Sequence, residues 1–311
     1  MITRTDVEAA ADRIAGRVRR TPVLAVEPEE FGTPVWWKLE QLQHTGSFKA
    51  RGAHNRILAA AESGTLTDAG VVAASGGNAG LAVAFVARRL GVPAEVHVPA
   101  NAPPYKVAAL TELGATVRQD GEQYAQAYAA ALESAAETGA LFCHAYDQPE
   151  ICAGQGTIGL ELADQVPALH TVLLAVGGGG LMAGVAAALE GQARVVGVEP
   201  ETIPTLHEAL RAGQPVDVDV SGIAADSLGA RRLGEIAYEV ATRTGVRSVL
   251  VPESEIVRAR QLLWRRWRLV VELGTATAVA ALLCGAYRPE PEERIAVLLC
   301  GGNTDPSDLT G

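Results

Sequence analysis

The sequence has few residues that could bind a transition metal or build a disulfide framework, and they are scattered. Its four cysteines show no CxxC spacing, and its six histidines form no HxxxH or HExxH pair. Zinc sites and disulfide-stabilised folds need such groupings. We therefore expect reduced, buried thiols and no dedicated transition-metal centre. The cysteines are Cys143, Cys152, Cys284 and Cys300.

Long basic runs and long apolar runs are missing too. The chain has 36 acidic against 26 basic residues, a formal net charge of -10, whereas a nucleic-acid-binding surface needs a concentrated basic face. No segment offers about 18 uncharged apolar residues, and the N-terminus lacks the apolar core of an export signal. We expect a cytoplasmic protein that binds neither nucleic acid nor membrane and has a small molecule as its partner.

Aromatic residues are also scarce, at 5% of the chain, whereas hydrophobic residues make up 48% and glycine occurs 33 times. This composition is typical of a globular α/β protein rich in small aliphatic side chains. A chain of 311 residues exceeds what one hydrophobic core usually organises. We therefore expect two lobes.

Short apolar runs alternate with alanine-rich helical stretches along most of the chain. The predicted strands are residues 35–39, 71–74, 95–98, 172–176, 195–198 and 295–299. Before them, Val7, Ala10 and Ile14 fall on one helical face, and Thr5 and Glu8 have the spacing of a capping box. The alternation predicts parallel sheets covered by helices.

Glycine-rich turns follow three of these strands, at residues 75–78, 177–180 and 301–303. In open α/β sheets, ligands lie at the carboxyl ends of the strands, and glycines there let backbone amides approach an anion. The three turns together predict one shared anionic ligand.

The densest of these turns, Gly177–Gly180, fits two kinds of ligand. Four residues without Cβ can form a nest of N–H donors around a phosphate at a helix N-terminus. Alternatively, Gly178, Gly180 and Ala183 match the GxGxxG/A pattern of a dinucleotide-binding turn, with Glu199 at the place of the ribose-binding acid. That pattern normally opens the first βα unit of its domain, whereas this one lies far along the chain. On this segment alone, both ligands stay open.

A lysine occurs soon after the predicted strand 35–39, in the segment Ser47-Phe48-Lys49-Ala50-Arg51-Gly52-Ala53. A desolvated lysine loses its proton readily, and a neutral amine forms an imine with an aldehyde. The segment matches the SFKxRGA signature and so resembles the serine/threonine dehydratases and serine racemases, which are fold-type II pyridoxal phosphate enzymes. Further motifs of that family follow in order at residues 75–80, 153–157, 177–180 and 300–303, so the similarity covers nearly the whole chain.

The resemblance implies a complete cofactor site. Lys49 would hold pyridoxal 5'-phosphate as a Schiff base and act as the catalytic base, Phe48 would pack against the cofactor ring, and Asn78 would hydrogen-bond its phenolic oxygen. Cys300 would face the pyridine nitrogen, and because a thiol is a weak acid, it would not force that nitrogen into its charged form. This arrangement favours β-elimination over a long-lived carbanion. The cofactor phosphate would bind to Gly177, Gly178, Gly179 and Gly180.

The turn after residue 74 would bind the substrate carboxylate. Gly76 stands where racemases carry a second serine as proton donor, which counts against racemisation. Ala79 replaces a histidine common among relatives and is compatible with elimination. The expected substrate-binding residues are Ser75, Gly76, Gly77, Asn78 and Ala79.

Other positions affect metal binding and substrate choice. Glu199 matches an acidic metal ligand of many racemases, but Thr205 stands where a second acid belongs, so we predict no metal site and keep Glu199 as a weak alternative. Glu272 would lie near the cofactor ring or cap a helix, and Asp226 belongs to a turn similar to the family's substrate-side turn. Arg51 is expected to form a structural ion pair or to act as a capping residue rather than to bind substrate.

The resemblance implies a fold-type II, tryptophan synthase β-like architecture of two lobes, each with a mostly parallel open sheet flanked by helices. The large cofactor-binding domain would be residues 1–64 and 148–311, and the small substrate-closing domain residues 65–147. The expected activity is β-elimination of water from L-threonine or L-serine, which gives a 2-oxo acid and ammonia, in a homodimer. A serine racemase, a dinucleotide-dependent oxidoreductase and an amino-acid sensor that keeps the cofactor are the alternatives.

Overall fold

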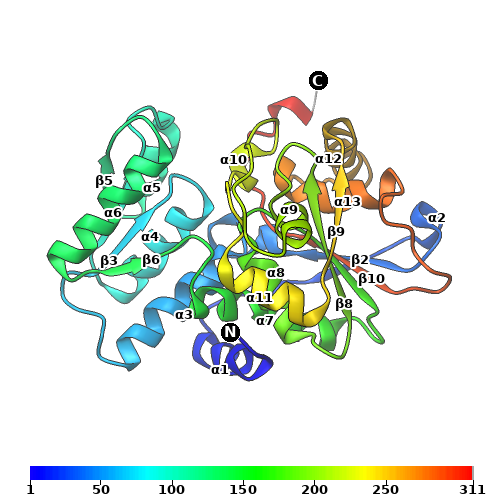
Figure 1. Ribbon diagram of the computed structural model, residues 1–311, viewed down its shortest axis with the longest axis horizontal. Coiled ribbons are helices and arrows are strands. Elements are labelled where there is room, and N and C mark those ends of the chain that lie inside the picture. Colours follow the sequence, from blue (N-terminus) through cyan, green and yellow to red (C-terminus); the bar gives the residue numbers. More distant parts are fainter. Residues whose placement is uncertain (310–311) are drawn as a thin grey trace.

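A computed structural model describes residues 1–309 and has two sheets, each flanked by helices (Figure 1). The four-stranded sheet uses residues 71–143, and the strands of the six-stranded sheet come from both sides of that stretch along the chain. We call the parts built on these sheets the small lobe and the large lobe. The two-lobed α/β architecture is confirmed, while the domain boundaries after residues 64 and 147 stay a prediction.

The sheet of the large lobe has the strand order β1-β2-β10-β7-β8-β9. Only β1 pairs antiparallel, with β2; the other pairings are parallel. The central strands β7 and β10 are buried on both faces, which is why they are uninterrupted apolar runs. The strands are β1 Val23–Val26, β2 Val35–Leu39, β7 Thr171–Ala175, β8 Arg194–Pro200, β9 Arg247–Val251 and β10 Ile295–Leu299.

The sheet of the small lobe has the order β5-β4-β3-β6 and is parallel throughout. Its strands are β3 Val71–Ala74, β4 Ala94–Val98, β5 Thr116–Gln119 and β6 Leu141–Cys143. Each of the six predicted strands is present to within two residues. The edge strand β5 was not among them because none of its residues is buried, so it lacks an apolar run.

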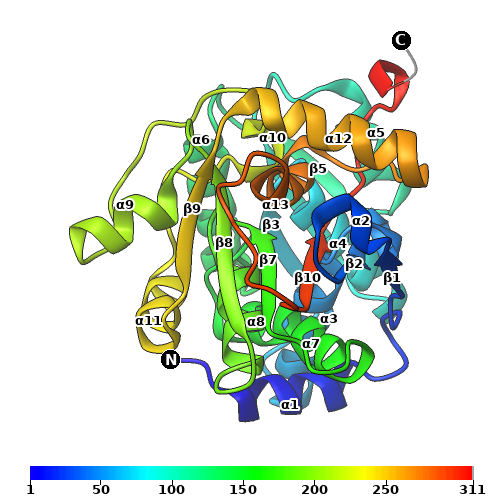
Figure 2. The ribbon, with the colours of Figure 1, turned by 90° about the vertical axis from the view of Figure 1, so that its right-hand side faces the viewer.

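Helices cover both faces of the large sheet (Figure 2). Leu173 of β7 packs in the apolar cluster of α13, whereas its neighbours Val172 and Leu174 pack in the cluster of α8. Among residues 1–309, no helix combines the length and apolarity that crossing a membrane requires. The helices are α1 Arg4–Ile14, α2 Pro28–Phe31, α3 Lys49–Glu62, α4 Asn78–Leu90, α5 Pro104–Glu112, α6 Tyr124–Thr138, α7 Pro149–Gln165, α8 Gly180–Ala188, α9 Thr205–Ala212, α10 Ala225–Leu228, α11 Glu235–Thr244, α12 Glu253–Trp267 and α13 Leu273–Leu283, with short 3-10 turns η1 Glu40–Leu42, η2 His44–Gly46 and η3 Ser307–Leu309.

The first helix buries the predicted face but begins earlier than its predicted capping box. Val7, Ala10 and Ile14 are buried as expected. The capping residue is Thr3, and the carboxylate of Asp6 accepts a hydrogen bond from the Thr3 backbone at 2.8 Å. The prediction of a box between Thr5 and Glu8 was therefore wrong, because two overlapping threonine–acid pairs have the same spacing.

Glycines let α7 pack closely against α3 and α8. A Cβ on Gly154 would lie 2.7 Å from the carbonyl oxygen of Arg51 in α3. A Cβ on Gly156 would lie 2.5 Å from the carbonyl oxygen of Gly184 in α8. Larger residues would force these helices apart, so the glycines fix the position of α3, whose first residue is Lys49.

Candidate active site

Backbone contacts bring the predicted lysine beside the end of β10. The Phe48 backbone N–H donates to Cys300 O at 3.0 Å, and Ser47 forms an isolated bridge with Gly301. The Lys49 amine donates to Ala145 O at 2.6 Å, at the end of the small-lobe segment. Residues far apart in the sequence thus meet at the carboxyl ends of the strands, where α/β proteins bind their ligands.

Burial makes the amine of Lys49 a weaker base than a free lysine. Desolvation lowers its pKa to about 8, although the nearby Cys300, Cys152 and Glu272 act in the opposite direction. With that pKa, about a tenth of the amine is neutral at pH 7, and the neutral form is the nucleophile for an aldehyde. The Lys49 Nζ also lies 5.0 Å from the centroid of the Phe48 ring.

The glycine quartet forms the turn between β7 and α8 and is built to hold an anion. Gly179 has φ +85, a conformation that favours glycine, and Gly180 is the first residue of α8. Within residues 1–309, the backbone N–H groups of Gly178 and Gly179 donate to no hydrogen bond. Free donors at a helix N-terminus suit a phosphate, so the quartet fits the phosphate of pyridoxal phosphate.

Cys300 is a buried thiol at the end of β10. Its Sγ lies 3.2 Å from Thr275 Oγ1, and that hydroxyl also donates to Gly301 O at 2.9 Å. Burial raises the pKa of the Cys300 thiol to about 12. The thiol therefore stays neutral at physiological pH. A neutral group is what the resemblance implies for the partner of the pyridine nitrogen. The contact between Cys300 and that nitrogen stays a prediction.

Asn78 is held in place across the two lobes by Glu272 and the loop after β10. Asn78 Nδ2 donates to both carboxylate oxygens of Glu272, at 2.9 and 3.1 Å, and Asn78 Oδ1 accepts from Asn303 Nδ2 at 2.6 Å. Burial raises the pKa of Glu272. Of the two roles expected for Glu272, the helix cap is not formed, because its side chain makes no capping hydrogen bond to α13. The carboxylate instead positions Asn78.

The predicted carboxylate-binding turn, residues 75–79, leads from β3 into α4, and all five residues are partly exposed. The Gly77 N–H donates to Ser75 Oγ at 3.2 Å, and Asn78 is the first residue of α4. The turn thus places a hydroxyl and helix N-terminal amides within reach of a ligand. Around a Cβ built on Gly76, the three nearest atoms among the described residues, its two chain neighbours apart, are carbons of Val98 and Lys106, at 3.4 to 4.0 Å, so no acid or hydroxyl oxygen of those residues lies closer.

Sequence reasoning missed Tyr146, whose ring packs on the glycine quartet, and His144, which lines a small cavity together with Lys49. A Cβ on Gly178 would come within 2.4 Å of the Tyr146 ring, so that ring packs directly on the turn. His144 Nδ1 accepts from the backbone N–H groups of Tyr146 and Asp147, at 3.1 and 2.8 Å. Burial lowers the pKa of His144 to about 4. Their position just before the motif at residues 153–157 was the only signal in the sequence.

Both carboxylate oxygens of Glu199 accept hydrogen bonds from the protein. The residue is fully buried and accepts from two backbone N–H groups at the start of α9, at 2.6 and 2.9 Å, and from Ser248 Oγ at 2.9 Å. Thr205 Oγ1 lies 3.1 Å from Glu199 and 2.6 Å from Gly177 O. Burial raises the pKa of Glu199 to about 7. Glu199 and Thr205 therefore stabilise the glycine turn, because the Thr205 hydroxyl joins Glu199 to the backbone of Gly177.

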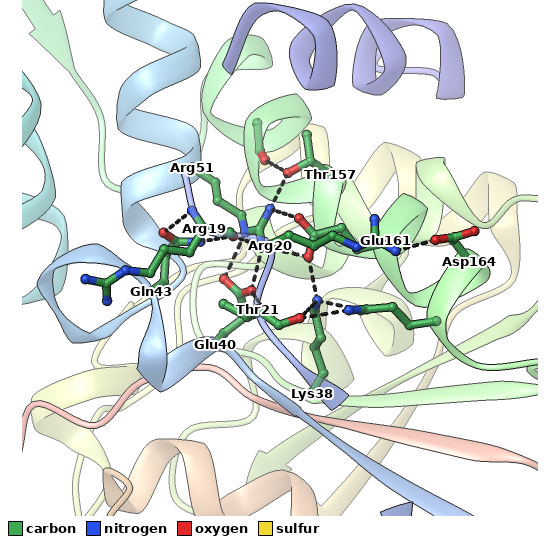
Figure 3. A network of polar contacts seen from close by, with 12 residues as sticks. Arg19, Arg20, Thr21, Lys38, Glu40, Gln43, Arg51, Thr157, Glu161 and Asp164 are labelled. Atoms are coloured by element: carbon green, nitrogen blue, oxygen red, sulfur yellow. Dashed lines mark hydrogen bonds and ion pairs between the residues drawn. The ribbon is translucent and has the colours of Figure 1, made fainter. Parts of the chain in front are cut away.

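A buried ion network fixes α3 against η1 and α7 (Figure 3). Arg51, fully buried two residues after Lys49, donates to Glu40 at 2.7 and 2.9 Å and to Glu161 at 2.7 and 3.0 Å. Lys38, also fully buried, donates to Glu161 as well. Two cations thus balance two carboxylates. The expectation that Arg51 forms a structural ion pair is confirmed.

Comparisons with known proteins agree with this geometry. Residues 14–301 match the family model of the pyridoxal-phosphate dependent enzymes. The chain is 39% identical over 315 residues to an L-threonine ammonia-lyase of Geobacter sulfurreducens, covering 100% of this chain and 78% of that protein. It is 39% identical over 301 residues to a phenylserine dehydratase of Ralstonia pickettii, covering 94% and 90%. The crystal structure of a serine racemase from Dictyostelium discoideum superimposes with a TM-score of 0.91 at 31% identity, covering 98% and 99%. The chain therefore belongs to the family of pyridoxal-phosphate dependent enzymes, with the fold-type II architecture that its motifs predict.

Proposed function

We propose that this enzyme removes water from a β-hydroxy amino acid, L-threonine or L-serine, and releases a 2-oxo acid and ammonia. The observation that carries the proposal is the amine of Lys49, whose pKa is lowered to about 8 by burial, next to the neutral thiol of Cys300. The names of the two relatives, an L-threonine ammonia-lyase and a phenylserine dehydratase, support the same class of reaction.

Lys49 is the base in this proposal. It would hold the cofactor, and its free amine would remove the proton from Cα, carry it on Nζ and pass it to the departing β-hydroxyl, which leaves as water. Pyridoxal phosphate supplies the electron sink that takes up the electron pair left on Cα. The neutral thiol of Cys300 leaves this sink weak, which favours rapid loss of the β-hydroxyl.

Other residues of the site would orient the reactants. The quartet Gly177–Gly180 would bind the phosphate through its free N–H groups, Phe48 would pack against the ring, and Asn78, held by Glu272, would hydrogen-bond the phenolic oxygen. The turn 75–79 binds the substrate carboxylate at the N-terminus of α4. This orientation keeps the Cα–H bond pointed at Lys49 and aligned with the electron sink.

The small lobe, residues 65–147, closes on the substrate and excludes water. An ion pair between Lys106 in α5 and Asp226 in α10 joins the lobes, and the Lys106 stem lies beside Gly76 in the carboxylate-binding turn. Racemisation is disfavoured, because a second proton donor on the opposite face is missing at Gly76. We also propose a cytoplasmic homodimer without nucleic-acid or membrane partners; light scattering of the purified protein tests the dimer.

A panel of L-serine, L-threonine, threo-phenylserine and hydroxyaspartate, assayed for 2-oxo acid and ammonia, tests the proposed function. We expect turnover of threonine or serine, no formation of D-serine, and loss of all turnover in Lys49→Ala. Borohydride reduction should attach the cofactor to the peptide that contains Lys49, with the peptides of Lys38 and Lys106 as unmodified controls. Turnover that survives Lys49→Ala would contradict the proposal.

A further inference from the structure

Gln155, in the middle of α7, carries a buried amide without a protein partner. The residue is fully buried, and neither its Oε1 nor its Nε2 forms a hydrogen bond with any of the described residues. A primary amide offers two N–H donors and one carbonyl acceptor. Because a buried polar group without a partner is destabilising, native proteins pair such groups with protein atoms or with ordered water.

Gln155 lines a small cavity together with Lys49, the residue proposed to hold the cofactor. The cavity has a volume of about 10 Å³, which is room for the centre of about one water molecule. Small or apolar side chains form much of the wall, and the small side chain of Ala79 helps to leave this space open. The lining residues are Lys49, Ala53, Ala79, Val83, His144, Ala145, Ile151 and Gln155.

The polar lining groups match the needs of one water molecule, which are two to four hydrogen-bond partners. Gln155 provides an acceptor and donors. His144 Nδ1 already accepts two backbone N–H groups, so the neutral ring carries its proton on Nε2 and keeps that donor. Lys49 uses one N–H on Ala145 O, and its ammonium form has two more donors. Three residues with polar side chains therefore line one water-sized space.

We propose that this cavity holds one ordered water molecule that links the amide of Gln155 to the nitrogen of Lys49. The inference rests on the proposed role of Lys49. The water accepts a hydrogen bond from the protonated nitrogen and donates one to Gln155 Oε1. Gln155 is thus a positioning residue that acts through the water: it stabilises the charged form of Lys49 while the nitrogen carries the proton taken from Cα.

This arrangement answers a physical difficulty of the site. Burial disfavours a charge on Lys49, yet a base that removes the Cα proton must carry that charge until it passes the proton on to the departing hydroxyl. One hydrogen bond from a charged donor to water, itself anchored by an amide, offsets part of that desolvation. The cavity therefore keeps Lys49 a strong enough base in an apolar setting.

A crystal structure of the holoenzyme with a bound substrate analogue, at about 1.5 Å resolution, tests the water directly, because the Lys49 amine is then free of the cofactor. We expect a density peak within hydrogen-bonding distance of both the Gln155 amide and the Lys49 nitrogen. An empty cavity, an ion in that place, or a direct hydrogen bond from the Gln155 amide to the cofactor or a protein group would overturn the proposal.

Two substitutions test, in solution and without relying on turnover, whether Gln155 affects the protonation of Lys49. We call this effect the coupling. The readout is the midpoint of the pH dependence of the rate at which the cofactor-free enzyme captures pyridoxal phosphate, which follows deprotonation of the free Lys49 amine. Gln155→Met, similar in shape and apolar, should lower this midpoint by about one pH unit. Gln155→Glu should raise it, because a carboxylate anchored beside the water favours the positive charge. The opposite directions separate the effect from a general loss of packing.

Gln41 offers a matched control, because its amide is also buried without a partner but does not line the cavity. Gln41→Met should leave the midpoint unchanged. If Gln155→Met and Gln155→Glu both left it within about 0.2 pH units of the unmodified enzyme, or moved it in the same direction, the coupling would be refuted. A missing dehydratase activity would instead refute the proposed function, since neither readout requires turnover.

Discussion

Replacing Arg51 by methionine removes one charge from the centre of the network that anchors α3 (Figure 3). Methionine keeps most of the length of the side chain and fills the space. The change leaves Glu40, which is fully buried, and Glu161 with Lys38 as the remaining cation. Two buried carboxylates then share one positive charge.

The magnitude follows from the burial of the partners. Removing one member of a buried, hydrogen-bonded ion pair costs about 3–5 kcal/mol, because the remaining charge loses its compensation. Glu40 loses both hydrogen bonds from Arg51, at 2.7 and 2.9 Å. Arg20→Met is the control, because the pair of Arg20 with Asp164 is exposed, and such pairs contribute about 0–1 kcal/mol.

Urea unfolding followed by tryptophan fluorescence reports on the large lobe, since Trp36 and Trp37 lie in β2 and Trp264 and Trp267 in α12. With a slope of about 3 kcal/mol/M, the midpoint of Arg51→Met should fall by about 1–1.7 M. The midpoint of Arg20→Met should change by less than about 0.3 M. A loss below about 1 kcal/mol for Arg51→Met would refute the view that this network holds α3 in place.

Four further predictions concern the site. After removal of the cofactor, the rate of pyridoxal phosphate capture should rise with pH and level off above about pH 8, because only the neutral amine of Lys49 reacts. A capture rate that is flat from pH 6 to 9 would contradict the conclusion that burial lowers the pKa of Lys49. Cys300→Ser should retain turnover, whereas Cys300→Asp should lower kcat by about tenfold or more, because a carboxylate would stabilise the protonated, positively charged form of the ring nitrogen; equal kcat values would show that this position does not tune the cofactor. Chelation with EDTA should leave kcat within about twofold of the untreated value, since both carboxylate oxygens of Glu199 already accept hydrogen bonds. A tenfold loss of kcat that Mg²⁺ restores would disprove this prediction. Asp226→Asn should raise KM by about fivefold at low salt with little change in kcat, because the substitution removes the ion pair with Lys106. An unchanged KM would show that this ion pair does not help the two lobes to close on the substrate.

Local sequence patterns were sufficient to predict most of the strands and turns that position the site. The six predicted strands are present because buried parallel strands are continuous apolar runs, and the glycine turns follow three of them. The strands β5 and β9 are largely exposed or partly buried, so they carry a weaker pattern. The opening helix shows the limit of such reasoning: its buried face was predicted, but its capping residue was not, because neighbouring threonines have equivalent spacing.

The sequence by itself determined which chemistry is present: the lysine signature at residues 47–53, the glycine quartet, the thiol after β10, and the family to which they belong. Tertiary structure alone decided what surrounds these groups, because contacts between segments far apart in the chain leave no local pattern. The donation from Lys49 to Ala145, the ring of Tyr146 on Gly178, and the unpaired amide of Gln155 beside the same cavity all depend on how α3, α7 and the small lobe pack together. Burial, which lowers the pKa of Lys49 and raises that of Cys300, is likewise a property of the packed molecule, since desolvation depends on neighbours in space rather than in sequence.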